Sequence, residues 1–297
     1  MDTILLNGRP VSISLLEKLK GRINKLSTNN VVPKLAAILV GNDPASQVYV
    51  NSKKKVFENH GCRSETFHFS SNFNQQEIID LIEKLNQDDQ IHGILIQLPL
   101  PKTLDSKKIL NSVLPEKDVD GFHPFNLGSL LEGNPTFIPC TPNGILEIFK
   151  FYEIQVSGRH VVIIGRSNIV GKPLFALLAQ KFEIGNATVT LCHTGTKNLK
   201  KHILEADILI AAVGSPKMID GKMIKEGVDI IDVGINRIDD GSSKGYHLVG
   251  DVDTDSVLGV ANSVTPVPGG VGPMTITMLL HNTVVSAERC RELELSK

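Results

Sequence analysis

A lysine on an apolar helix face is the residue of this sequence whose surroundings most directly suggest chemistry. The segment Pro44–Asn59 has helical periodicity, and at about 100° per residue Tyr49, Lys53, Val56 and Phe57 share one face. Such a lysine either extends past the core edge to keep its amine in water, or is desolvated with a lowered pKa. A desolvated neutral amine could accept a proton in catalysis. The helix alone leaves both interpretations open.

A side-chain amide lies at the end of a predicted buried strand. The segment Gly93–Leu98 is apolar apart from Gln97, and Pro99 and Pro101, which cannot donate to a sheet ladder, follow it. We therefore expect Gln97 at the carboxyl end of a strand, where open parallel sheets bind ligands. An amide that only caps the loop backbone is the alternative.

Two aspartates lie in the segment Pro115–Gly121. A calcium loop that opened at Asp118 would need glutamate at its twelfth position, where the chain has Ser129, so calcium is excluded. In an extended segment Asp118 and Asp120 point to the same side. One of them can face a cleft while the other holds the turn.

A glycine-containing turn follows another predicted strand and opens a helix. Gly165 and Gly171 would let the backbone approach a pyrophosphate at the helix N-terminus. The spacing is G-x5-G rather than G-x-G-x-x-G, so a purely structural turn is also compatible with it.

The residues around this turn favour NADP over NAD. The next strand ends at Cys192 and continues into His193 and Thr194, without the acidic residue that holds a free ribose 2′-hydroxyl. Arg166 in the turn and Lys197 beyond the strand could pair with a 2′-phosphate. A solvated loop is the alternative interpretation.

The chemistry-bearing residues need a framework of strands and helices. Short β-branched runs alternate with amphipathic stretches, which is typical of an α/β fold with parallel sheets. The predicted strands are Leu35–Val40, Glu65–Phe69, Gly93–Leu98, Val161–Gly165, Ala187–Cys192, Ile208–Val213 and Ile230–Val233. The predicted helices are Pro44–Asn59, Gln75–Asn86, Gly171–Lys181 and Met274–Arg289. We interpret Pro115–Gly144 as a hinge and cleft wall, and Thr265–Thr275 as either a nest of N–H donors or an interdomain turn.

Length and composition limit the number of domains and the class of protein. The chain has 297 residues, enough for about two domains, and its 41% hydrophobic and 21% charged residues exclude a disordered chain. A net charge of −1 gives no footprint for nucleic acid or an anionic membrane. The four cysteines form no CxxC pair, which argues against zinc and disulfides and for a reducing cytoplasm. Neither a secretion signal nor a membrane span is expected.

In their order along the chain, these motifs resemble the bifunctional methylenetetrahydrofolate dehydrogenase/methenyltetrahydrofolate cyclohydrolase family. The likeness covers nearly the whole chain, and its last motif is highly specific. It is carried by Tyr49-x3-Lys53, Gln97-Leu-Pro-Leu-Pro101, Asp118-Val-Asp-Gly121, Gly165-Arg-Ser-Asn-Ile-Val-Gly171-Lys-Pro173 and Pro266-Val-Pro-Gly-Gly-Val-Gly-Pro-Met-Thr275. The resemblance implies two α/β domains around a cleft in a homodimer. Residues 1–143 with 273–297 would bind folate, and residues 144–272 would form a Rossmann domain that binds NADP.

The resemblance also implies roles for individual residues. Lys53 would be the catalytic lysine, with Gln97 bonded to it and Tyr49 packed on the pterin. Asp120 would hold the N–H groups of the pterin ring. The other implied folate contacts are Leu98 and the loop Pro268, Gly269, Gly270, Val271 and Gly272. The implied cofactor contacts are Gly165, Arg166, Ser167, His193, Thr194 and Ile235.

The implied reaction is hydride transfer from 5,10-methylenetetrahydrofolate to NADP, followed by hydration of the methenyl cation to 10-formyltetrahydrofolate. No metal is implied. Another NADP oxidoreductase, such as a shikimate-type dehydrogenase, would explain the second half but not Gln97, Asp120 and the Pro268 loop together. A nucleotide-binding protein without catalysis would treat Lys53 as packing.

Overall fold

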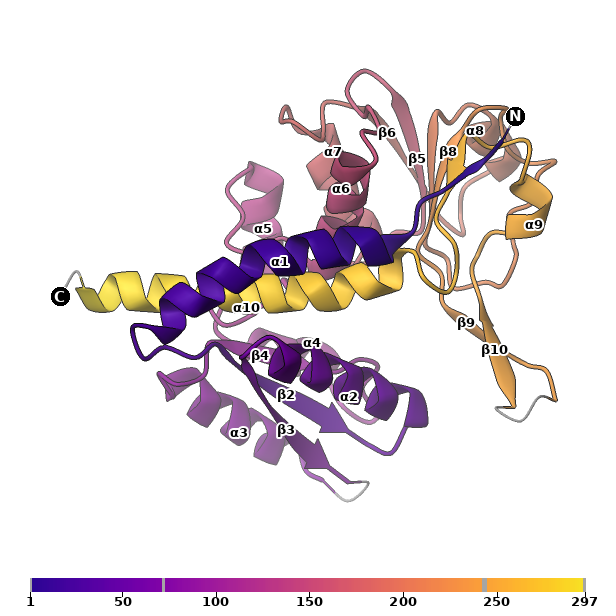
Figure 1. The fold of residues 1–297 in the computed structure, drawn as a ribbon. Helices are drawn as coiled ribbons and strands as arrows, with labels where there is room; N and C mark the ends of the chain where they lie inside the picture. Colours follow the sequence, from indigo (N-terminus) through magenta and orange to yellow (C-terminus); the bar gives the residue numbers. More distant parts are fainter. Residues whose placement is uncertain (1, 71–72, 242–244, 296–297) are drawn as a thin grey trace. The chain divides into compact units, whose positions relative to one another are not determined.

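The chain forms two compact units in a computed structural model that describes residues 2–70, 73–241 and 245–295 (Figure 1). The first unit holds the residues up to Ile13 together with Thr141–Thr275, and the second holds Ser14–Cys140 together with the residues from Ile276 onward. The predicted folate-binding part also contained residues 1–13, so this division of the chain differs from the predicted one. Its physical reason is the strand β1 (Ile4–Leu5), which pairs in parallel with β11 (Ser263–Val264).

The first unit contains a parallel six-stranded sheet. Its order is β1, β11, β8 (Asp229–Asp232), β7 (Ile208–Ala211), β5 (His160–Ile164) and β6 (Thr188–Cys192). The chain runs from β5 to β6 on one side and then returns to place β7 on the other side of β5. Such a reversal opens a crevice at the carboxyl ends of the strands, which is where doubly wound sheets bind ligands. The predicted Rossmann-type sheet is confirmed.

The remaining elements of the first unit flank this sheet. The helices are α6 (Cys140–Phe151), which begins at the unit's boundary, α7 (Gly171–Ala179), α8 (Leu199–Leu204) and α9 (Thr254–Val257). Strands β9 (Asn236–Asp239) and β10 (Tyr246–Val249) form an antiparallel pair. The interiors of β5 and β7 are apolar on both faces, as expected when parallel strands are covered on both sides.

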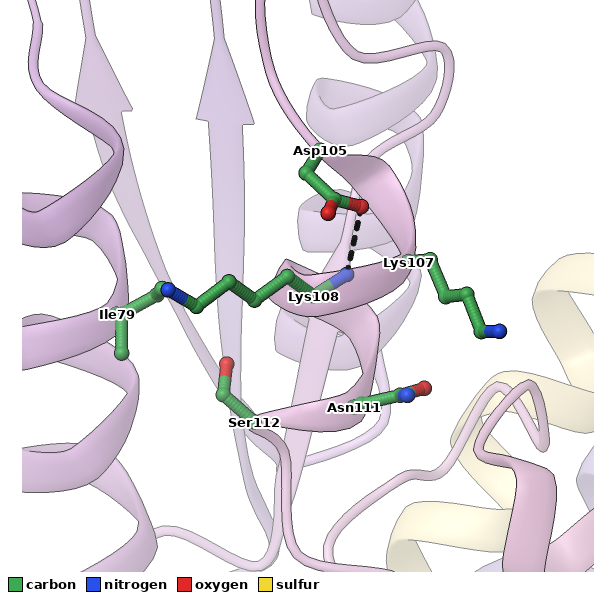
Figure 2. A pocket seen from close by; sticks show the side chains of 6 residues that line it. All are labelled: Ile79, Asp105, Lys107, Lys108, Asn111 and Ser112. Atoms are coloured by element: carbon green, nitrogen blue, oxygen red, sulfur yellow. Dashed lines mark hydrogen bonds between the residues drawn. The ribbon is translucent and has the colours of Figure 1, made fainter.

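The second unit contains a parallel three-stranded sheet in the order β3 (Arg63–Phe69), β2 (Lys34–Val40) and β4 (Gly93–Ile96). Its helices include α2 (Pro44–Asn59), α3 (Gln75–Gln87), α4 (Ser106–Asn111) and α5 (Pro124–Glu132). Helix α4 begins where the carboxylate of Asp105 accepts the backbone N–H of Lys108 at 3.0 Å (Figure 2). Two long helices, α1 (Gly8–Ser27) and α10 (Val271–Leu295), contribute residues to both units.

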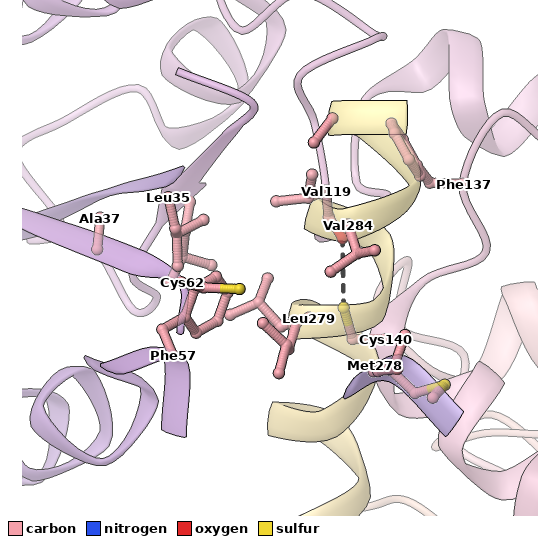
Figure 3. Packing of buried hydrophobic residues seen from close by; sticks show 14 of the residues in the cluster. Leu35, Ala37, Phe57, Cys62, Val119, Phe137, Cys140, Met278, Leu279 and Val284 are labelled. Carbon is pink, nitrogen blue, oxygen red and sulfur yellow. Dashed lines mark hydrogen bonds between the residues drawn. The ribbon is translucent and has the colours of Figure 1, made fainter. Parts of the chain in front are cut away.

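Strand β2 separates two apolar clusters in the second unit. Its side chains alternate, so that Leu35, Ala37 and Leu39 face one cluster and Ala36, Ile38 and Val40 face the other. The first cluster also takes residues from α1, α2 and α10, as Figure 3 shows for Phe57 and Leu279. The second cluster takes residues from α3 and α4. The sheet thus has helices on both faces and exposes its carboxyl ends to the connecting loops.

The segment predicted as a hinge contains regular structure. Helix α5 begins at the N-cap His123, whose Nδ1 accepts the backbone N–H of Phe125, and it ends at Gly133, which has a positive φ of 97°. Among the described residues, no helix combines the length and apolar character that a membrane crossing requires.

Candidate active site

Lys53 of α2 is buried, with 6% of its surface exposed. Its Nζ donates a hydrogen bond of 3.0 Å to Oε1 of Gln97 and lies 5.9 Å from the centre of the Tyr49 ring. Burial lowers the pKa of this amine, while the charges of Asp120 and Cys140 act in the opposite direction. Of the two interpretations that the helix left open, the structure therefore matches the desolvated amine.

The buried face of α2 differs slightly from the predicted one. It consists of Ser46, Val50, Lys53 and Phe57, and Tyr49 is half-buried at its border. The helix is fixed by its N-cap residue Asp43, whose carboxylate accepts the N–H of Ser46 at 2.8 Å. Lys53 is thus on the inward face, and Tyr49 remains accessible to a ligand.

Gln97 is the first residue after β4, as the two following prolines indicated. Its backbone N–H donates to the carbonyl of Ile38 at 2.9 Å, and its side-chain Nε2 donates to the carbonyl of Leu98 at 2.6 Å. The amide therefore caps the loop backbone and also turns its oxygen toward Lys53. The structure therefore shows the capping interaction considered for this amide, and it adds a hydrogen bond to Lys53.

The two acids of the Asp118–Gly121 segment have different surroundings. Asp118 accepts the N–H of His123 at 2.7 Å and the side-chain amide of Asn126 at 2.8 Å, so it holds the turn that starts α5. Burial raises the pKa of Asp118 to about 6. Burial also raises the pKa of Asp120, and the charge of Lys53 opposes that shift. Asp120 is thus the acid that interacts with the buried amine.

Cys140 also belongs to the group of side chains around Lys53, although its residue type and spacing did not indicate this. Its thiol is buried, lies 3.3 Å from the carbonyl of Val119 and interacts with the carboxyl group of Asp120. Burial raises the pKa of this thiol well above its usual value. Asn282 of α10 donates to the same carbonyl of Val119 at 2.9 Å. No local signal marks these two residues, because they reach the site only through tertiary packing.

A cavity of about 500 Å³ lies in the first unit at the carboxyl ends of β5, β6 and β7. Five of the predicted cofactor contacts line it, namely Gly165, Arg166 and Ser167 after β5, and His193 and Thr194 after β6. Its other lining residues are Ile164, Thr196, Leu199, Ala212, Val213, Ser215 and Met218. The cavity occupies the position at which the strand order reverses.

The residues of this cavity fit a dinucleotide with a 2′-phosphate. A Cβ on Gly165 would lie 2.1 Å from the carbonyl oxygen of Ala212, and one on Gly171 would lie 1.9 Å from that of Gly165, so only glycine permits this tight turn. Arg166 is exposed at the cavity, and within the described ranges no carboxylate lines it. A cation without a competing acid is the arrangement that a phosphate requires.

Ile235 and the loop of residues 268–272 lie elsewhere in the first unit. Ile235 is 45% exposed, and a Cβ placed on Gly272 would lie 3.7 Å from its Cδ1. The carbonyl of Gly269 accepts the N–H of Gly8 at 2.9 Å, and the N–H of Gly270 donates to the carbonyl of Pro266 at 2.7 Å. The loop is therefore a tight turn held against the start of α1.

Comparisons with known proteins agree with this geometry. Residues 6–120 match the model of the tetrahydrofolate dehydrogenase/cyclohydrolase catalytic domain, and residues 139–291 match that of the family's NAD(P)-binding domain. The bifunctional protein FolD of Acetivibrio thermocellus is 50% identical over 97% of this chain and 98% of its own length.

Solved structures show the same relationship. The bifunctional FolD of Campylobacter jejuni has a TM-score of 0.91 and 46% identity, over 97% of this chain and 99% of that one. The enzyme of Trypanosoma brucei, solved with NADP cofactor and an inhibitor, has a TM-score of 0.92 and 35% identity, over 97% and 98%. The chain belongs to the tetrahydrofolate dehydrogenase/cyclohydrolase family.

Proposed function

We propose that this chain oxidises 5,10-methylenetetrahydrofolate with NADP and hydrolyses the 5,10-methenyl product to 10-formyltetrahydrofolate. In the first step the folate loses a hydride to the cofactor and becomes the methenyl cation. In the second step water adds to that cation, the ring opens, and one proton is released. The observation that carries the proposal is the buried amine of Lys53, bonded to Gln97 within the segment that matches the family's catalytic domain.

The cofactor would be held by Gly165, Arg166, Ser167, His193 and Thr194. When bound, NADP supplies the hydride acceptor. The glycine turn gives the pyrophosphate close access to backbone, and Arg166 pairs with the 2′-phosphate. The imidazole of His193 is oriented by the backbone of Gly195, whose N–H donates to Nδ1 of His193 at 3.0 Å.

Lys53 would act as the general base of the hydrolysis. Its amine is desolvated, and a neighbouring methenyl cation would favour the neutral form further, because like charges repel. A neutral amine accepts a proton from the attacking water. Gln97 holds the amine in position through its oxygen, and the bond from its Nε2 to Leu98 fixes which way the amide points.

The folate would be bound by the residues around this amine. Asp120 offers a carboxylate to the N–H groups of the pterin, and the half-buried ring of Tyr49 offers a surface on which the pterin can stack. We also propose that Leu98 and the loop of residues 268–272 contact the folate, and that Ile235 contacts the nicotinamide side of the cofactor.

A two-part assay on one preparation tests the proposal. NADP reduction is followed with methylenetetrahydrofolate as substrate, and hydrolysis of added methenyltetrahydrofolate is followed without cofactor. Both activities are expected. Hydrolysis without NADP reduction would overturn the dehydrogenase assignment, and the absence of both would indicate a nucleotide-binding protein without catalysis.

We further propose that the chain is cytoplasmic and forms a homodimer. The cytoplasmic location is supported by the thiols of Cys62, Cys140 and Cys192, which are buried and do not form disulfides. The homodimer is supported by the family membership. Sedimentation equilibrium across a hundredfold range of concentration would detect a monomer, which is the outcome that contradicts the dimer.

A further inference from the structure

Asp251 is a completely buried acid that the proposed mechanism does not use. Its carboxylate accepts hydrogen bonds from three consecutive backbone N–H groups, at 2.7 Å from Val213, 3.0 Å from Gly214 and 2.9 Å from Ser215. It accepts a fourth bond, of 2.9 Å, from the side-chain amide of Asn236. One carboxylate therefore ties two segments together.

Both segments belong to the cofactor-binding part of the first unit. Val213 and Ser215 follow β7 and line the cavity assigned to the cofactor. Gly214 between them has a positive φ of 67°, and such a residue lets successive N–H groups converge on one anion. Asn236 directly follows Ile235, the residue expected beside the nicotinamide. The carboxylate thus fixes one wall of the cavity and the neighbouring segment.

A second buried acid holds Asp251 in place. Oδ1 of Asp232 accepts the backbone N–H groups of Asp251 at 2.9 Å and Gly234 at 3.0 Å, and its Oδ2 accepts that of Val252 at 2.9 Å. A Cβ on Gly250 would lie 1.8 Å from Oδ2 of Asp232. Position 250 therefore accommodates only glycine, and the segment around Asp251 packs tightly against Asp232.

We propose that Asp251 is a positioning residue for the cofactor, which sets the conformation of residues 213–215 that dinucleotide binding requires. Removing its charge leaves backbone donors unpaired or opposite an amide, so the turn rearranges to find other acceptors. The inference rests on the assignment of the cavity to NADP. Its test therefore measures binding directly as well as activity.

Asp229 provides a matched control. It lies on the same strand as Asp232, at the opposite end of β8, and is 3% exposed. It accepts hydrogen bonds from Arg159 at 2.7 Å, Asn262 at 2.7 Å and Ser263 at 2.6 Å. None of these partners lines the cofactor cavity. Its loss should therefore affect stability alone.

The experiment compares Asp251→Asn with Asp229→Asn by calorimetric titration with NADP, by thermal unfolding without ligand, and by cofactor-free hydrolysis of methenyltetrahydrofolate. Both substitutions are expected to lower the unfolding temperature and to leave hydrolysis within about twofold of the unsubstituted protein. Only Asp251→Asn should raise the Kd for NADP, by about tenfold or more, which is the worth of one or two lost hydrogen bonds to a charged group.

A third variant keeps the proposal testable if Asp251→Asn does not fold. Asn236→Ala deletes one donor and keeps the carboxylate, and should weaken NADP binding by a smaller factor. Equal Kd values for Asp251→Asn, Asn236→Ala and the unsubstituted protein would overturn the proposal, as would an equal loss of affinity in Asp229→Asn. If the unsubstituted protein does not bind NADP, the cofactor assignment fails first and the role of Asp251 with it.

Discussion

The site around Lys53 and the cavity around Arg166 differ in the groups that form them. The first is a set of side chains whose pKa values are all shifted by desolvation, namely the buried Lys53 and Cys140 and the half-buried Asp120. The second consists of backbone turns and exposed side chains at the ends of strands. Desolvation holds an amine in the neutral form that can accept a proton, whereas a cofactor that brings its own reactivity needs only to be held.

This comparison predicts that substitutions at the two sites affect different steps of the reaction. At the buried site they should change a chemical step. At the cofactor cavity they should change affinity and leave folate hydrolysis intact.

The largest effect is expected from Lys53→Met. Methionine preserves most of the buried stem and removes the amine, so folding and much of the dehydrogenase activity should remain. The hydrolysis rate should fall by about 10²–10⁴, the usual contribution of a positioned general base. Hydrolysis of methenyltetrahydrofolate and NADP reduction are measured on one preparation.

Lys55→Met is the matched control, because Lys55 is an exposed lysine on the same helix. It should leave both rates unchanged. A Lys53→Met protein that hydrolyses at a near-normal rate would show that the buried amine is only packing. Gln97→Ala should show the same selectivity as Lys53→Met with a smaller loss.

A second prediction concerns stability and uses one buried acid from each unit. Burial raises the pKa of both Asp118 and Asp232 from 3.8 to about 6. The folded state therefore holds these protons to higher pH than the unfolded state does. The stabilisation is fully present below the unfolded pKa and is lost as the pH rises through the folded pKa, by up to about 3 kcal/mol per group.

Asp118→Asn tests the sign of this effect, because an amide is neutral at every pH. Relative to that of the unsubstituted protein, the free energy of unfolding of this variant should increase as the pH rises from about 4 to 7, because only the unsubstituted protein loses stabilisation over that range. Urea unfolding at several pH values measures the change. A difference that stays constant with pH would show that the folded and unfolded pKa values of Asp118 are the same.

The third prediction separates the two neighbouring acids of the second unit. Asp120→Ala should lower both activities together, by roughly 10- to 100-fold, because both use the same bound pterin, whose ring donors would be left unpaired. Asp118→Asn should affect stability and spare both rates, since Asp118 holds the turn to α5. The reverse pattern would mean that the two roles are exchanged.

Much of the framework could be predicted because its signals are local. The apolar run of β4 stops at two prolines, which fixes Gln97 at the carboxyl end of the strand. Helical periodicity placed Lys53 on the apolar face of α2, although it left open whether the amine reaches water. The glycine turn after β5 is likewise read from adjacent residues. In each case the residues that determine the local structure lie in the same helix or strand as the residue concerned, or directly next to it in the sequence.

The missed features depend on partners that are distant in sequence. Strand β1 has only two residues, too few for a periodic signal, and it exists because it pairs with β11. Cys140 and Asp251 are buried by contacts that no spacing indicates. Helix α1 is different, because Leu15, Leu19 and Ile23 follow a helical spacing, which is a local signal.

The smallest predicted effect concerns the choice of cofactor. Arg166→Ala should raise the KM for NADP by roughly tenfold, because about 1.5–3 kcal/mol of charged hydrogen bonding to the 2′-phosphate is lost and solvent recovers part of it at an exposed site. The KM for NAD, which lacks that phosphate, should change little. Lys172→Ala is the control, because Lys172 is a cation near the same turn whose amine donates to Asn168 at 2.8 Å and which does not line the cavity. If NAD and NADP give equal kinetics in the unsubstituted protein, Arg166 does not select the cofactor, and the cavity recognises only what the two dinucleotides share.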